Sequence, residues 1–120
     1  MAKVVHFEIP VDDAQRARAF YRDVLDWQVA DSDEGYWLVT AGPPDDVGAD
    51  GALITRGELH ASPVLVVGVG DLDATVAKAE SAGGQVLHGR MEIPGVGWSA
   101  YVRDTEGNVV GLFQPAPGAG

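Results

Sequence analysis

The amino-acid sequence predicts an α+β fold made of two tandem modules, each with the order strand, helix and three further strands (βαβββ). Two observations carry this prediction: an alternating apolar segment leads into a helical pattern and short strand candidates, and the same order begins again 58 residues later, with Asp71 in the place of Asp13. Each module has too few strands to close a core of its own. We therefore expect a curved mixed sheet around a cavity, with the helices outside.

The first module is expected over residues 4–55. Residues 4–11 alternate with period two, which places His6 and Glu8 on one face of a strand. The opposite, apolar face consists of Val5, Phe7, Ile9 and Val11. Asp12-Asp13 then supplies a helix N-cap. The expected apolar stripe of the helix is Ala17, Phe20, Tyr21, Val24 and Leu25, and strands are expected at 27–30, 36–41 and 52–55, with a turn-rich linker at 42–51.

The second module is expected over residues 63–114. A strand at 63–69 precedes the N-cap Asp71 and a helix that ends at Gly83-Gly84. The apolar stripe of this helix is Leu72, Val76, Ala79 and Ala82, and strands are expected at 85–88, 98–103 and 109–114. The segment 115–120 has little to bury and is expected to form a flexible tail.

Composition narrows the class of protein. A chain of 120 residues suits a single domain, here residues 1–120, and the absence of cysteine excludes disulfides and thiolate metal sites. A net charge of −10 disfavours nucleic acid and anionic membranes as partners. No segment has the length or apolar character of a signal peptide or a membrane span, so we expect a cytoplasmic protein.

Three segments together resemble the glyoxalase/bleomycin resistance/dioxygenase proteins, the vicinal oxygen chelate superfamily. They are residues 6–13 (HFEIPVDD), 19–27 (AFYRDVLDW) and 104–108 (DTEGN), and the likeness covers nearly the whole chain. The ending Gly-Leu-Phe-Gln at 111–114 is similar to the uncharacterised bacterial branch related to lactoylglutathione lyase. The resemblance implies a glyoxalase-like fold and a homodimer.

In this superfamily, enzymes hold one divalent metal through side chains from four strands, which polarises the substrate. The resemblance places the first of these ligands on His6, which is retained. The other three positions carry no donor side chain: Val64 (Leu65 if the register slips by one), Gly111, and Ala52 or Leu53. Because a catalytic metal needs about three protein ligands, we expect no metal and no other cofactor. A site that recruits Glu58 or His60 from the loop before the second module is the alternative.

We expect the ligand to contact His6, Glu8, Val64, Tyr101, Gly111 and Phe113. His6 and Glu8 are also the candidates for catalysis, and His88 is expected at an exposed strand end. The pattern leaves open whether Trp98 or Tyr101 faces the cavity. The leading hypothesis is a small-molecule-binding protein without a catalytic metal. The alternatives are a lyase, isomerase or dioxygenase that uses a metal or His6 and Glu8 as acid and base, and a non-catalytic interaction module.

Overall fold

The computed structural model of the chain describes residues 2–118 and contains two compact units. The first unit comprises residues 6–64, and the second comprises residues 2–5 together with 65–118. Each unit contains one helix and a four-stranded sheet, so the α+β class and the repeated βαβββ order are confirmed.

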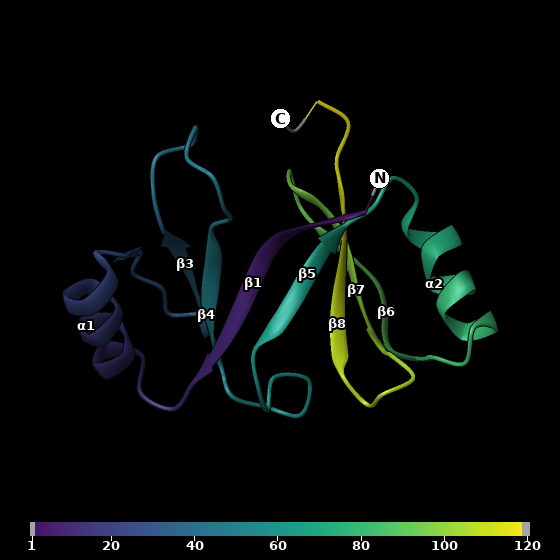
Figure 1. The fold of residues 1–120 in the computed structure, drawn as a ribbon, viewed down its shortest axis with the longest axis horizontal. Coiled ribbons are helices and arrows are strands. Elements are labelled where there is room, and N and C mark those ends of the chain that lie inside the picture. The colour runs from purple at the N-terminus through teal and green to yellow at the C-terminus, as the bar shows by residue number, and fades with distance from the viewer. Residues whose placement is uncertain (1, 119–120) are drawn as a thin grey trace. The chain divides into compact units, whose positions relative to one another are not determined.

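In the first unit the elements are β1 (Lys3–Val11), α1 (Ala14–Leu25), β2 (Gln28–Val29), β3 (Tyr36–Thr40) and β4 (Gly51–Thr55). The strand order is β2-β3-β4-β1, with β1 parallel to β4 and the other pairs antiparallel (Figure 1). The register pairs Glu8 of β1 with Ala52 of β4, and Ala52 in turn with Leu38 of β3.

In the second unit the elements are β5 (Val64–Gly68), α2 (Leu72–Ser81), β6 (Gln85–Ile93), β7 (Gly97–Arg103) and β8 (Val109–Pro115). The strand order β5-β8-β7-β6 repeats the order of the first unit, with β5 parallel to β8. The two sheets therefore have the same connectivity, as the repeat in the sequence predicts.

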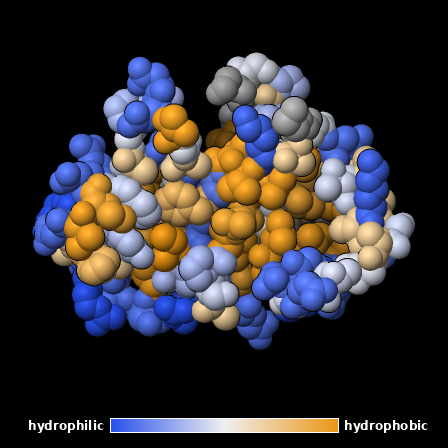
Figure 2. All heavy atoms as spheres, in the orientation of Figure 1, coloured by the Kyte–Doolittle hydropathy of each residue, from blue (hydrophilic) through white to orange (hydrophobic). Residues whose placement is uncertain are grey.

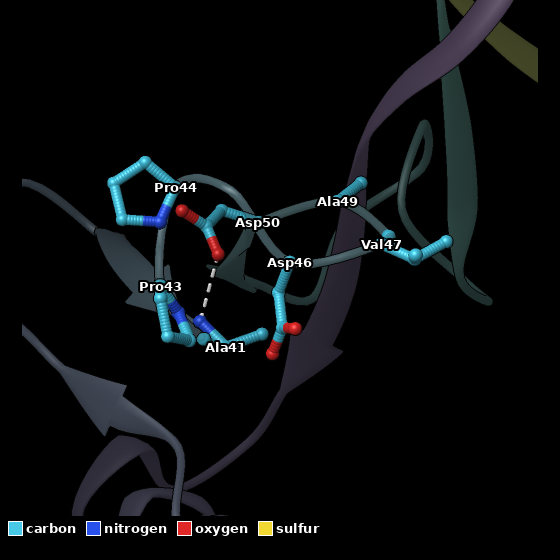
Figure 3. Close-up of a pocket in the computed structure, with 9 residues that line it drawn as sticks. Ala41, Pro43, Pro44, Asp46, Val47, Ala49 and Asp50 are labelled. Carbon is cyan, nitrogen blue, oxygen red and sulfur yellow. Dashed lines mark hydrogen bonds between the residues drawn. The ribbon is translucent and has the colours of Figure 1, made fainter.

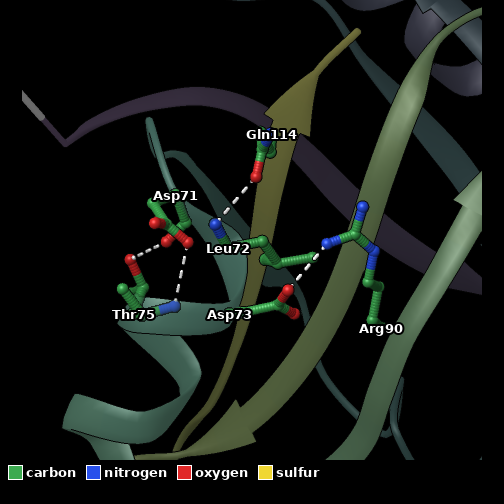
Figure 4. Close-up of polar contacts among 7 residues, drawn as sticks. Asp71, Leu72, Asp73, Thr75, Arg90 and Gln114 are labelled. Carbon is green, nitrogen blue, oxygen red and sulfur yellow. Dashed lines mark hydrogen bonds and ion pairs between the residues drawn. The ribbon is translucent and has the colours of Figure 1, made fainter.

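Both helices begin at the predicted N-caps. The carboxylate of Asp13 accepts a hydrogen bond from the backbone N–H of Arg16 at 3.0 Å, and that of Asp71 accepts one from Ala74 at 3.0 Å. Figure 4 shows how the start of α2 is tied to its sheet: the Leu72 N–H donates to the side-chain oxygen of Gln114 on β8 at 2.8 Å.

A second tie joins α2 to β6, where Arg90 donates to Asp73 at 2.8 Å (Figure 4). The guanidinium of Arg90 also lies 4.7 Å from the centre of the Trp98 ring on β7. These contacts fix the N-terminal end of α2 over its sheet.

Each unit packs its helix against one face of its sheet. In the first unit the buried cluster is Val11, Val29, Val39 and Leu53, with Phe7, Ile9, Ala14, Ala17, Tyr21, Trp27 and Trp37 packed against it. In the second unit the cluster is Val69, Leu72, Ala100, Val102 and Leu112, joined by Val76, Ala79 and Trp98 among others. The other face of each sheet carries no helix of its own unit.

Four residues that the pattern assigned to the core are exposed, which corrects that prediction. Phe20, Val24 and Leu25 of α1 are 57%, 60% and 47% exposed. α1 meets its sheet through Ala14, Ala17 and Tyr21. Phe20 lies more than a quarter of a turn from the centre of that stripe and faces outward, while Val24 and Leu25 belong to the last turn of the helix, which ends at Leu25. Val5 is also exposed.

One strand, β6, extends well beyond its predicted end. β6 extends to Ile93, so His88 lies within a strand and not at its end, although its side chain is exposed as expected. Irregular pairing between β6 and β7 around His88 explains why simple alternation did not reveal this extension. β8 includes Pro115, and the Ala116 N–H donates to the Val96 carbonyl at 2.9 Å. Residues 119–120 of the expected tail lie outside the described residues.

Apolar side chains gather over β5 and β8 in the view of Figure 2. The exposed apolar residues of the second unit include Val4 and Leu65. Neither α1 nor α2, the two helices of residues 2–118, has the length and apolar character needed to cross a membrane.

The approach of Phe7 to β4 generates the first prediction. A β-carbon added at Gly51 would overlap the ring of Phe7, which packs against Trp27 with the ring centres 5.3 Å apart. Gly51→Ala should therefore lower the free energy of unfolding by about 1–3 kcal/mol, the usual cost of overpacking a core. Urea denaturation would measure the loss. The control is Gly57→Ala, whose new methyl group meets nothing within 4 Å; equal stability of the two variants would contradict the prediction.

Candidate functional site

The candidate site lies on the face of the first unit's sheet that α1 does not cover. β1 places Phe7, Ile9 and Val11 against the helix side, so strand alternation turns His6 and Glu8 to the other side. His6 is half-buried, while Glu8 is only 4% exposed. A carboxylate this far from water needs partners, since a buried unpaired charge is very costly.

One partner of Glu8 is His60. Its Nε2 lies 2.7 Å from Oε1 of Glu8, and His60 is itself 6% exposed. The loop that carries His60 is held in place by Arg56, which donates to Asp12 at 2.8 Å and to the Ala61 carbonyl at 2.8 Å. His60 therefore turns toward Glu8, whereas Glu58 is exposed.

Tyr36 of β3 extends the network to His6. The tyrosine hydroxyl lies 2.7 Å from Nε2 of His6. Burial raises the pKa of Tyr36 well above its usual value of 10, and Glu8 raises it further through its negative charge and by hydrogen bonding to the hydroxyl. His60, Glu8, Tyr36 and His6 thus form one connected polar group.

A small residue between β1 and β3 makes this network possible. Ala52 of β4 is fully buried and pairs with Glu8 on one side and Leu38 on the other, so β4 contributes only a methyl group to this face at that position. β1 and β3 are two strand spacings apart, roughly 10 Å. The long side chains of Tyr36 and His6 meet across that distance at their 2.7 Å contact.

The electrostatic surroundings of His6 favour its neutral form on balance. Burial lowers the pKa of His6, and the charges of Glu8 and Asp50 oppose that shift without cancelling it. Asp50 is held at the base of the loop 41–50, where its carboxylate accepts from the Ala41 N–H at 2.8 Å (Figure 3).

Two hollows in the first unit are lined by none of His6, Glu8, Tyr36 and His60. The loop 41–50 encloses about 140 Å³ (Figure 3), which is below the roughly 300 Å³ usual for small-molecule sites. A larger hollow of about 660 Å³ lies beside α1. Its charged side chains, Arg18 and Arg22, are already paired with Asp31 and Asp23, and none of these four residues is buried.

In the second unit the structure decides between Trp98 and Tyr101. Trp98 packs with the helix-side cluster under α2, so Tyr101 lies on the opposite face. Tyr101 pairs with Gly111 and is buried, and Phe113, two residues beyond Gly111, shares that face and is half-buried. A β-carbon at Gly111 would come within 3.4 Å of the Tyr101 ring. Val64, at the start of β5, is buried.

Equivalent pairings show how the two sheets differ. Glu8 pairs with Ala52 in the first unit as Val66 pairs with Gly111 in the second. His6 and Glu8 of the first unit therefore correspond to Val64 and Val66 of the second. By the pairing of β3 with β4, Tyr36 corresponds to Ser99. The polar network belongs to the first unit, and the second carries two valines and one serine at the same positions.

These positions do not fit the divalent metal that the resemblance implies. The register settles the open alternatives: Leu53 belongs to the helix-side cluster and Leu65 is 58% exposed, so the positions in question are Ala52 and Val64. Neither these nor Gly111 carries a donor atom in its side chain. Within residues 2–118, no three His, Asp or Glu side chains are grouped as a metal site requires.

Tyr36 is the member of the network that the sequence did not single out. Strand alternation could have identified Tyr36, since its neighbour Trp37 is apolar and belongs to the helix side, which turns Tyr36 to the opposite face. The pairing of β3 with β4, which brings Tyr36 toward β1, cannot be read from the chain itself.

Comparison with known proteins gives a consistent family. The family model described as the Glyoxalase/Bleomycin resistance protein/Dioxygenase superfamily matches residues 3–112. Among curated proteins, the putative glyoxylase CFP32 of Mycobacterium bovis and of Mycobacterium tuberculosis is 47% identical over 49 residues. That match spans 41% of this chain and 19% of the relative.

Solved structures share the fold. A methylmalonyl-CoA epimerase from Mycobacterium tuberculosis is similar with a TM-score of 0.66 and 21% identity, over 94% of this chain and 87% of that one. A glyoxalase/bleomycin resistance protein/dioxygenase superfamily member from Vibrio splendidus gives 0.69 and 17%, over 97% and 100%. At these identities the likeness concerns the fold, and the glyoxalase-like fold class is confirmed.

The raised pKa of Tyr36 predicts a loss of stability at alkaline pH. The folded state keeps the phenol proton to a higher pH than the unfolded chain, so this stabilisation is complete below about pH 10 and is lost as pH rises toward the folded-state pKa. Tyr36→Phe should therefore show a smaller fall in the free energy of unfolding between about pH 9 and about pH 11.5. Urea denaturation across this range would test it. Tyr21→Phe, on the helix side, should behave like wild type; parallel curves for wild type and Tyr36→Phe would contradict the prediction.

Proposed function

Because the chain belongs to the glyoxalase/bleomycin resistance protein/dioxygenase superfamily, we propose that it binds a small organic molecule at the polar face of the first unit, without the superfamily's divalent metal. The observation that carries this proposal is the connected group of His60, Glu8, Tyr36 and His6 on a sheet face that its own helix leaves uncovered.

The energetics of the network support a functional interpretation. A buried ion or polar pair seldom adds net stability compared with well-packed apolar side chains of similar volume. The second unit shows part of that replacement, since Val64 and Val66 stand at the places of His6 and Glu8. Perturbed titratable groups that share a charge partner are typical of functional sites. Retention of the network in the first unit is therefore best explained by recognition of a ligand.

The residues of the network take different parts in this proposal. Glu8 and His60 are buried and hydrogen-bond to each other, so we expect them to hold the site in place without touching the ligand. His6 is half-buried and is the member we expect to touch the ligand. Tyr101, Gly111 and Phe113 stay candidates for ligand contact on the uncovered face of the second unit's sheet.

Acid-base catalysis by His6 and Glu8 is the rival function. It is less well supported, because a general acid or base must reach its substrate and Glu8 is nearly inaccessible behind His60 and Tyr36.

The absence of donor side chains at the superfamily's ligand positions predicts that the purified protein carries no stoichiometric nickel, zinc, iron or manganese. Elemental analysis after exhaustive dialysis would measure the content. A metal retained at near-equimolar amounts would contradict the prediction and would favour a metal-dependent enzyme.

Recognition by His6 predicts the effect of removing its imidazole. His6→Ala should weaken binding by about 1–3 kcal/mol, the usual cost of leaving a buried polar partner unsatisfied. The ligand would come from thermal-shift screening of small polar aromatic compounds, and calorimetry would give the affinities. His88→Ala is the matched control, since His88 is exposed on β6 and should leave binding unchanged. Unchanged affinity in His6→Ala with the ligand bound would refute a contact with His6.

A further inference from the structure

The exposed apolar residues of α1 have no counterpart on α2. Phe20 and Val24 are 57% and 60% exposed, and they are neighbours along one edge of the helix because they lie four residues apart. Figure 2 shows apolar side chains over α1. None of the exposed large apolar residues within 2–118 belongs to α2. When the two helix N-caps are superposed, Lys78 and Ala82 stand at the positions of Phe20 and Val24. The fold therefore does not require apolar side chains at these positions, and their exposure together is typical of an interaction site.

Charged side chains of opposite sign lie on either side of Phe20 along the helix. Arg16 is one turn before Phe20 on the same edge, Asp23 is three residues after it, and both are exposed. Among residues 2–118, the guanidinium of Arg16 has no hydrogen-bond or ion-pair partner. Asp23 accepts from Nε of Arg22 at 2.9 Å through one carboxylate oxygen only. Both charges are therefore able to pair with a partner molecule.

An antiparallel pair of α1 helices, related by a two-fold axis near Phe20, matches these charges. Around the helix, Arg16 and Asp23 lie about 40° and about 60° from Phe20 in the same direction. A two-fold axis keeps them on one side of the contact and brings the first half of one helix beside the second half of the other. Arg16 of each copy then faces Asp23 of the other, and the two Phe20 rings meet between these pairs. A parallel pair would instead set like charges side by side.

The net charge of the first unit also favours α1 as the place of contact between two copies. Residues 6–64 contain twelve Asp and Glu against four Arg, so two copies of this unit repel each other. Three of those four Arg belong to α1, and residues 12–26 contain four Asp against three Arg. At α1, with a local net charge of only −1, two copies can therefore approach with little repulsion.

We propose that two copies of this chain associate through antiparallel pairing of their α1 helices, with Phe20 at the centre and Arg16 of each copy paired with Asp23 of the other. One face of a twelve-residue helix offers less than the roughly 800 Å² per partner of a standard interface, so the association is weak and reversible. α1 packs on the face of its sheet opposite His6 and Glu8, so the dimer leaves the polar face open. The inference is independent of the ligand proposed above.

Sedimentation velocity of the full chain at concentrations from about 10 µM to about 500 µM measures the association. We expect wild type to shift from monomer toward dimer as the concentration rises. Phe20→Lys, which introduces the residue that α2 carries at this position, should weaken the association by about tenfold or more. The matched control is Leu65→Lys, because Leu65 is 58% exposed on β5 of the second unit and should leave the association unchanged. A wild type that stays monomeric throughout, or a dimer that is lost in Leu65→Lys and kept in Phe20→Lys, would overturn the proposal.

Exchange of charges tests the antiparallel arrangement itself. Arg16→Asp and Asp23→Arg each bring like charges together, so either variant alone should dimerise about tenfold more weakly than wild type at low ionic strength. An equimolar mixture of the two variants should recover dimers, because each substituted position then meets the opposite charge. Neither substitution should unfold α1, since an acidic residue in the first turn and a basic residue near the end both suit the helix dipole. A mixture that dimerises no better than the separate variants would overturn the proposal.

Discussion

The carboxylate of Glu8 is held almost entirely out of water, and the site depends on the polar contacts that offset the cost of burying it. A buried charge is tolerated only when polar partners stabilise it. The fold supplies such partners from two separate segments, the loop that carries His60 and the strand that carries Tyr36. The loop is fixed by Arg56, and Tyr36 is fixed by the pairing of β3 with β4. Two segments distant in the chain are thus engaged in stabilising one carboxylate.

The two faces of the first unit's sheet carry different kinds of side chain because of strand alternation. The helix side holds the apolar cluster that stabilises the first unit, and the uncovered side holds the polar network. Because the two sets of side chains point in opposite directions, the network can be changed without removing residues from the core. The second unit illustrates this freedom, since it has the same connectivity and a helix-side cluster while carrying Val64, Val66 and Ser99 at the equivalent places.

Small residues on the fourth strand of each repeat decide what can stand above the sheet. Ala52 leaves room for side chains from β1 and β3 to meet in the first unit, and Gly111 leaves room for the ring of Tyr101 in the second. Neither of these two positions carries a donor side chain for a metal.

The sequence by itself determined the elements, their repeat and the faces of each strand. Period-two alternation separated His6 and Glu8 from Phe7, Ile9 and Val11, and the N-caps Asp13 and Asp71 marked where both helices begin, because these signals depend on neighbours close in the chain. Tertiary structure decided which side chains meet: His60 with Glu8 across 52 residues, and Tyr36 with His6 across 30. Such contacts depend on strand pairing and loop direction. It also decided that α1 meets its sheet along Ala14, Ala17 and Tyr21, since the width of apolar stripe that a helix buries is set by the surface it packs against.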